Sequence, residues 1–122
     1  MNFAKWVYRV AGFYGILVLV PFYFIEQNPL AIPLPAITHP EYYYGFVGLG
    51  IAWQVVFLII STDPPKYRLL MLPSLIEKLS FAIAVAVLLA SGRVSAYIIP
   101  GATIDTILGV LFLVSFFKTR KA

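Results

Sequence analysis

Four polar side chains lie inside or beside long apolar stretches of the chain, where an unpaired polar group is costly. They are Gln54, Glu77, Asp105 and, in a connection, His39. A carboxylate or amide within an apolar stretch can hold a proton or the polar part of a ligand, and ionisable residues at membrane depth are by default functional candidates. We therefore treat Asp105, Gln54 and Glu77 as candidate ligand-binding residues.

Asp105 is the first of these candidates. It lies about six residues into an apolar stretch, which on an α-helix is roughly 9 Å from its start. Gly101 and Gly109 stand one turn to either side and would let another helix approach the same face. We expect Asp105 to point into a helix bundle. It is either a proton-binding or ligand-binding carboxylate, or a structural one paired with Arg93 or bonded to Gln54.

Glu77 is interpreted more readily as a structural residue. Ser74 and Glu77 have the spacing of a capping box, in which the glutamate bonds to the N-cap amide, and Arg9 is a second partner at similar depth. We expect the adjacent Lys78 to face elsewhere and to extend to the headgroups. Glu77 and Asp105 enter from opposite membrane faces and should differ in depth by on the order of 13 Å. Paired acid–base catalysis is therefore not expected.

Gln54 and His39 each have two interpretations. Gln54 lies near the middle of an apolar stretch beside Gly48 and Ala52, so it is either a ligand-binding residue or the donor of an interhelical hydrogen bond. His39 is the only histidine in the chain. Histidine is the usual axial ligand of haem, which makes His39 a candidate cofactor ligand; the alternative is a solvated or capping loop residue.

Apart from His39, the sequence gives little support for a metal or cofactor site. The chain has no cysteine and no second histidine, so it offers no set of ligands for zinc and no thiol chemistry. No metal and no cofactor is predicted, although bound lipid, quinone or pigment stays open.

The composition identifies the environment of these residues. The chain is 61% hydrophobic and 11% charged, whereas soluble domains are about 45–50% apolar and about 25% charged. A helix that crosses a bilayer needs about 20 mostly apolar residues, and four stretches meet or approach this length. We expect a single integral membrane domain, residues 1–122, of the all-α class: a four-transmembrane-helix bundle with helices at 4–25, 43–60, 72–90 and 99–117.

The basic residues predict the orientation of this bundle, because Lys and Arg favour the cytoplasmic side of a membrane. They precede the first stretch, separate the second from the third and follow the fourth, which places both the N and C termini in the cytoplasm. The residues are Lys5, Arg9, Lys66, Arg68, Lys118, Arg120 and Lys121. In the connection between the second and third stretches, Thr62 or Asp63 is a good N-cap ahead of Pro64. We expect a short helix to begin there and to bend near Pro73.

Three segments are the most distinctive in the chain: Gly50–Gln54, Asp63–Arg68 and Leu72–Lys78. With its four short helices and lone embedded acids, the chain resembles the DoxX-like group of small bacterial four-helix membrane proteins. That resemblance implies a location in the bacterial inner (cytoplasmic) membrane and assigns chemistry to no residue. The chain also matches small multidrug-resistance transporters in size, but it lacks their acidic residue in the first helix.

Three functions fit these features. An accessory or structural subunit of a larger membrane complex is favoured, because no convergent site is visible and small residues such as Ala82, Ala86 and Ala90 recur on helix faces. One alternative is a binder of a lipid, quinone or sterol, with Asp105 orienting the polar head; another is a proton-linked small transporter. An enzyme is not favoured. The expected partners are membrane lipids and other membrane protein subunits, and no basic run is long enough to indicate nucleic-acid binding.

Overall fold

Four long helices make up the protein. The computed structural model describes residues 2–24, 38–94 and 96–119, which contain helices and no strand. The long helices are α1 (Asn2–Leu19), α2 (Pro40–Thr62), α3 (Met71–Ala90) and α4 (Ile99–Lys118). Together with their flanking turns, all four are long and apolar enough to cross a membrane. Within the described residues, the prediction of an all-α protein with four helices long and apolar enough to span a membrane is confirmed, and these helices identify an integral membrane protein.

Proline and glycine set two of the helix ends. After α1 the chain tightens into the 3-10 turn η1 (Val20–Phe24), which contains Pro21; proline has no amide hydrogen to continue the α-helical pattern. Beyond α3, Gly92 has a φ of 74°, a left-handed conformation that favours glycine. This conformation lets the Arg93 amide donate to the Leu88 carbonyl oxygen at 2.9 Å, which satisfies a carbonyl at the end of the helix.

The connection between α2 and α3 differs from the prediction. Thr62 ends α2 and Asp63 is its C-cap. The Lys66 amide also donates to an Asp63 carboxylate oxygen at 3.5 Å, as it would to an N-cap, but a single turn follows in place of the expected short helix. The proline pair that follows ends α2, because the residue before a proline is disfavoured in the α conformation. The chain then turns, with the Tyr67 amide donating to the Asp63 carbonyl oxygen at 3.2 Å, and a 3-10 turn η2 (Arg68–Leu70) leads into α3. Pro73 lies in the first turn of α3, where no intrahelical hydrogen bond is lost.

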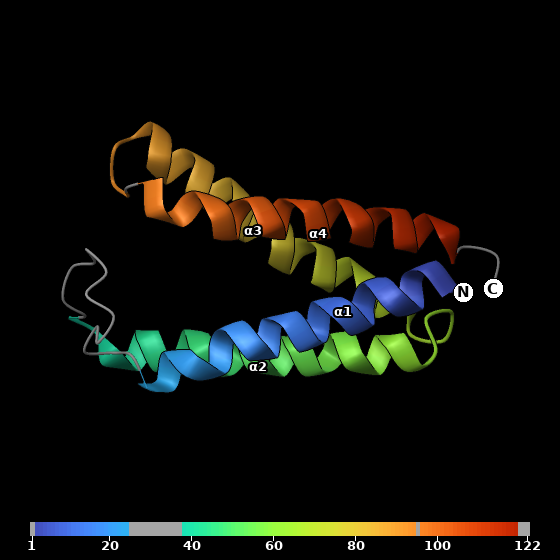
Figure 1. Cartoon of the computed structure of the whole chain (residues 1–122). Coiled ribbons are helices and arrows are strands. Elements are labelled where there is room, and N and C mark those ends of the chain that lie inside the picture. The colour runs from blue at the N-terminus through green and yellow to red at the C-terminus, as the bar shows by residue number, and fades with distance from the viewer. Residues whose placement is uncertain (1, 25–37, 95, 120–122) are drawn as a thin grey trace.

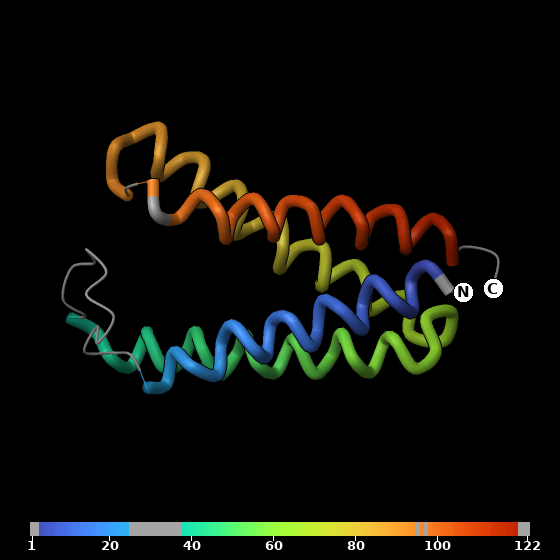
Figure 2. The backbone as a smooth tube through the Cα atoms, in the orientation of Figure 1, coloured from blue at the N-terminus to red at the C-terminus, as the bar shows by residue number. Residues whose placement is uncertain are grey.

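The helices pack as two pairs (Figure 1). α1 lies along α2, and α3 lies along α4; α1 also contacts α4, whereas α2 and α3 scarcely touch. The first residue of α1 and the last of α4 lie at the same end of the molecule, together with the connection from α2 to α3. We call this end the terminal end. The two pairs converge there and diverge toward the opposite end (Figure 2).

Aromatic side chains dominate the core near the terminal end. Tyr8 stacks on Phe112 with ring centroids 4.2 Å apart, and Phe57 meets Phe112 edge-on at 5.0 Å. Pairs in these geometries are more favourable than their buried area alone predicts. The buried apolar cluster consists of Ala4, Tyr8, Ala11, Phe57, Ile60, Met71, Leu108 and Phe112. Many large apolar side chains elsewhere on all four helices are exposed, as contact with lipid tails requires.

Two glycines allow the close contact between α1 and α2. A Cβ atom on Gly12 would lie 2.9 Å from the backbone oxygen of Gln54 and 2.6 Å from a methyl carbon of Leu58. A Cβ atom on Gly15 would overlap the Gln54 side chain. The α1–α2 pair therefore relies on small residues that let helix backbones approach, as helices in membranes commonly do.

Candidate functional site

Three charged side chains from α3 and α4 meet inside the membrane-spanning part of the bundle. The Lys78 ammonium lies 3.4 Å from a carboxylate oxygen of Asp105 and 3.5 Å from one of Glu77. The Lys78 side chain is 5% exposed, Asp105 is 19% exposed and Glu77 is 29% exposed. We call Glu77, Lys78 and Asp105 the charged cluster; the two carboxylates keep some access to what surrounds the bundle.

The cluster corrects three expectations. Glu77 and Asp105 both lie within 3.5 Å of one nitrogen atom, so the predicted large separation between them is wrong. Lys78 does not extend to the headgroups; its side chain is 5% exposed and its ammonium group contacts both carboxylates. Asp105 is paired with Lys78 and not with Arg93 or Gln54.

The predicted capping box is also absent. α3 begins at Met71, so Ser74 is already inside the helix and cannot be its N-cap. The Ser74 hydroxyl instead donates to the Leu70 carbonyl oxygen at 2.7 Å. Arg9 was the other expected partner of Glu77, but its guanidinium lies 5.4 Å from the centre of the Trp6 ring.

Packing holds the cluster between the core and α4. The Lys78 ammonium is 5.3 Å from the centre of the Phe57 ring, within reach of a cation–π interaction. A Cβ atom on Gly109 would lie 3.2 Å from a methyl carbon of Leu79 and 3.5 Å from the Cβ of Lys78, so α4 packs closely against α3 beside the cluster, as predicted. Gly101 does not share that role, because a Cβ atom there would meet open space.

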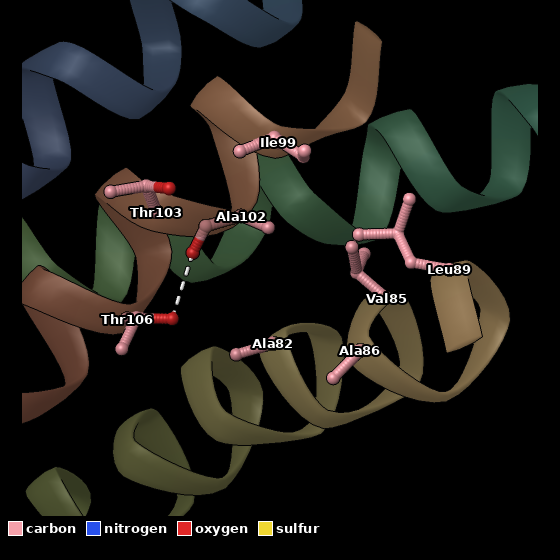
Figure 3. A pocket seen from close by; sticks show the side chains of 8 residues that line it. All are labelled: Ala82, Val85, Ala86, Leu89, Ile99, Ala102, Thr103 and Thr106. Carbon is pink, nitrogen blue, oxygen red and sulfur yellow. Dashed lines mark hydrogen bonds between the residues drawn. The ribbon is translucent and has the colours of Figure 1, made fainter. Parts of the chain in front are cut away.

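A groove of about 200 Å³ runs between α3 and α4 beyond the cluster (Figure 3). Ala82 and Ala86, expected to pack helices closely, instead line this groove, and the Thr106 hydroxyl on the facing side donates to the Ala102 carbonyl oxygen at 2.8 Å. Ala82 is four residues after Lys78 and therefore on the same helix face. The charged cluster thus lies one turn from the start of the groove. Its lining residues are Ala82, Val85, Ala86, Leu89, Ile99, Ala102, Thr103 and Thr106.

The charges of the cluster do not balance. Two carboxylates face one ammonium group, which leaves one negative charge in excess when all three are ionised. One carboxylate oxygen of Glu77 is buried and makes no hydrogen bond within the described part of the chain; its 3.5 Å distance to Lys78 is that of an ion pair. A ligand that reaches Glu77 therefore meets the exposed part of its side chain and not this buried oxygen.

Gln54 and His39 lie apart from the cluster. The Gln54 amide nitrogen donates to the Gly50 carbonyl oxygen in its own helix at 2.9 Å, and its buried amide oxygen has no partner in the ranges that the structure describes. The predicted interhelical hydrogen bond is therefore not observed there. His39 is exposed ahead of α2, with a ring nitrogen 3.7 Å from Glu41. Ligand binding by Gln54 and cofactor ligation by His39 stay predictions.

Sequence reasoning missed Lys78 as a member of the site. Its position one turn before the alanine stripe on α3 was the available signal, because that face was expected to pack inward. Among the described residues, no three His, Cys, Asp or Glu side chains gather to hold a metal ion.

No protein-family model, no curated protein sequence and no solved structure matches the chain. The resemblance to DoxX-like proteins therefore stays a prediction, and the function has to be inferred from the geometry of the site.

Proposed function

We propose that this membrane protein binds an amphiphilic small molecule, of the lipid, quinone or sterol class, between α3 and α4. The polar head of the molecule bonds to the charged cluster and its apolar part lies in the groove. The observation that carries this proposal is the position of Lys78 and Asp105 about one helical turn from a mainly apolar groove, within helices long and apolar enough to span a membrane.

Energetics favour a functional role for the cluster. Charged side chains at membrane depth are costly, and replacing a buried ion pair by apolar residues of similar volume is often neutral or stabilising. A bundle that needed only stability would therefore gain nothing from Glu77, Lys78 and Asp105. Polar groups that converge beside an apolar groove are instead typical of a small-molecule site.

The groove and the cluster constrain the molecule that binds. Lys78 can donate hydrogen bonds and Glu77 can accept one, so a hydroxyl group, which both donates and accepts, matches the cluster. The volume of about 200 Å³ is below the range of about 300–1,000 Å³ for drug-sized ligands. The groove therefore accommodates one chain or the narrow end of a molecule whose remainder lies in the bilayer.

Solvent extraction of the purified protein, followed by mass spectrometry of the extract, tests the proposal. We expect Ala86→Trp to remove the bound molecule by filling the groove, and Asp105→Asn to reduce its amount about tenfold, the equivalent of about 1.4 kcal/mol. Ala52→Trp is the matched control, because Ala52 is an exposed alanine on α2 that does not line the groove. Equal amounts of the same molecule in the wild type and all three variants would exclude this site.

A second candidate function is that of an accessory subunit in a larger membrane complex. The observation in its favour is the scarcity of contact between α2 and α3, which leaves each of these helices a face that a partner helix can cover. Gentle extraction tests this function: co-purifying membrane subunits of fixed stoichiometry support it, and a lone chain counts against it. For transport, the remaining alternative, unchanged pH-dependent flux in Asp105→Asn would be evidence against.

The proposed location is the bacterial cytoplasmic membrane, with the terminal end in the cytoplasm. The support is the gathering of basic residues at the terminal end, where Lys5, Arg9, Lys66, Arg68 and Lys118 lie, while Arg93 follows α3 at the opposite end. This distribution is the one that the positive-inside rule describes.

A further inference from the structure

A second apolar groove, of about 520 Å³, lies between α1 and α4. Its walls are formed by α1 and α4, whereas the first groove lies between α3 and α4. Trp6 and Val10 are 56% and 57% exposed, so the groove is open to the outside of the bundle. Its lining residues are Phe3, Trp6, Val7, Val10, Leu108 and Leu111.

Cations lie over both aromatic walls of this groove. The Lys118 ammonium is 4.9 Å from the centre of the Phe3 ring, and the Arg9 guanidinium is 5.4 Å from the centre of the Trp6 ring. The Lys5 ammonium also approaches Trp6, at 5.9 Å. Within the described ranges, none of these three cations forms a salt bridge with a carboxylate. Their positive charge is therefore available to an anion that enters the groove.

We propose that the α1–α4 groove binds an anionic phospholipid of the surrounding bilayer. One acyl chain lies along the six apolar residues of the groove, and the phosphate lies near Lys118 and Arg9. Basic residues beside membrane helices attract anionic lipids, and tryptophan is enriched at the level of the headgroups. An apolar groove whose aromatic walls carry cations, with no salt bridge to a carboxylate among the described residues, matches the two parts of such a lipid.

The charge distribution favours a phospholipid over a second copy of this chain. Every copy inserts in the membrane with the same orientation, so a second copy would bring its own Lys5, Arg9 and Lys118 to the same depth. Like charges there oppose association. An anionic headgroup is the complementary occupant.

Trp6 provides a direct probe of this site, because the chain has only two tryptophans. In a Trp53→Phe protein, the remaining fluorescence reports lipid contact at Trp6. The experiment reconstitutes this protein in vesicles of mixed lipids and measures quenching by brominated phosphatidylglycerol or brominated phosphatidylcholine. We expect the anionic lipid to quench Trp6 with a relative binding constant several-fold higher than that of phosphatidylcholine.

Two pairs of matched variants locate the preference. Lys118→Gln should lower the preference for phosphatidylglycerol about fivefold, whereas Lys66→Gln should leave it unchanged, because Lys66 lies over Tyr67 and not over a wall of the groove. Val10→Phe should reduce quenching by narrowing the groove. Val110→Phe, at a position of similar exposure outside the groove, should not.

Three results would overturn the proposal. Equal quenching by the two lipids in the Trp53→Phe protein would show that the groove has no preference for an anionic headgroup. If Lys66→Gln and Lys118→Gln lowered the preference for phosphatidylglycerol equally, the lipid would be attracted by the charge of the whole terminal end and not by this groove. A dimer in which Trp6 is shielded from both lipids would make this face a protein interface.

Discussion

Replacing Lys78 with methionine isolates the charge at the centre of the cluster, because methionine keeps an unbranched stem against Phe57. The lysine nitrogen lies 3.4 Å and 3.5 Å from two carboxylate oxygens. With an effective dielectric constant of about 20, each contact contributes about 5 kcal/mol of Coulomb attraction. Desolvation and repulsion between the carboxylates offset much of this. Loss of one partner from a buried ion pair costs about 3–5 kcal/mol, and we expect the free energy of unfolding to fall by this amount.

Reversible unfolding in mixed micelles of a mild detergent and dodecyl sulfate, followed by circular dichroism, measures the change. Lys66→Met is the control, since this exposed lysine should contribute less than about 1 kcal/mol. A triple variant that combines Lys78→Met with Glu77→Gln and Asp105→Asn should recover most of the loss, because no carboxylate is then left unpaired. A Lys78→Met protein as stable as Lys66→Met, or a triple variant as unstable as Lys78→Met alone, would refute this reasoning.

Four further substitutions test helix packing and side-chain contacts. Gly12→Ala should destabilise the protein by about 1–3 kcal/mol, because its methyl group would meet backbone of α2; Gly101→Ala, which faces open space, should be neutral or stabilising by up to about 1 kcal/mol in the same unfolding assay. Tyr8→Phe should not destabilise the protein, because the Tyr8 hydroxyl is buried without a hydrogen-bond partner among the described residues. A fall of more than about 1 kcal/mol in the free energy of unfolding would show that the hydroxyl has a partner. Arg68→Lys should lower the thermal midpoint of unfolding. Arg68 Nε donates to the Phe116 carbonyl oxygen at 3.0 Å, and the guanidinium lies 3.7 Å from the centre of the Phe116 ring. Lysine reproduces the charge but not the planar stacking, so an unchanged midpoint would argue against this contact.

The number of helices could be predicted from sequence because the bilayer sets a length of about 20 residues that few other structures require. The positions of the helix ends were predicted less accurately. Thr62 and Asp63 have the side chains of an N-cap, but the apolar run before them continues α2 to Thr62. A capping residue serves either end of such a connection, and only the tertiary structure shows which helix it belongs to.

The charged cluster could be predicted only in part. Asp105 and Glu77 were recognisable as costly carboxylates at membrane depth, but their separation was inferred from helix rise alone. Helix rise gives the axial position of a Cα atom and not the reach of a side chain. Lys78 closes the remaining distance, and that contact depends on the packing of α4 against α3 at Gly109.

Native mass spectrometry of the protein, extracted gently from its own membrane, tests the proposed function most directly. We expect a single chain that carries a small molecule of reproducible mass, and we expect Asp105→Asn to lose that mass while the chain remains folded. Discrete masses of partner proteins with no small molecule bound, or a small-molecule mass that Asp105→Asn and Ala86→Trp both retain in full, would contradict binding at the charged cluster.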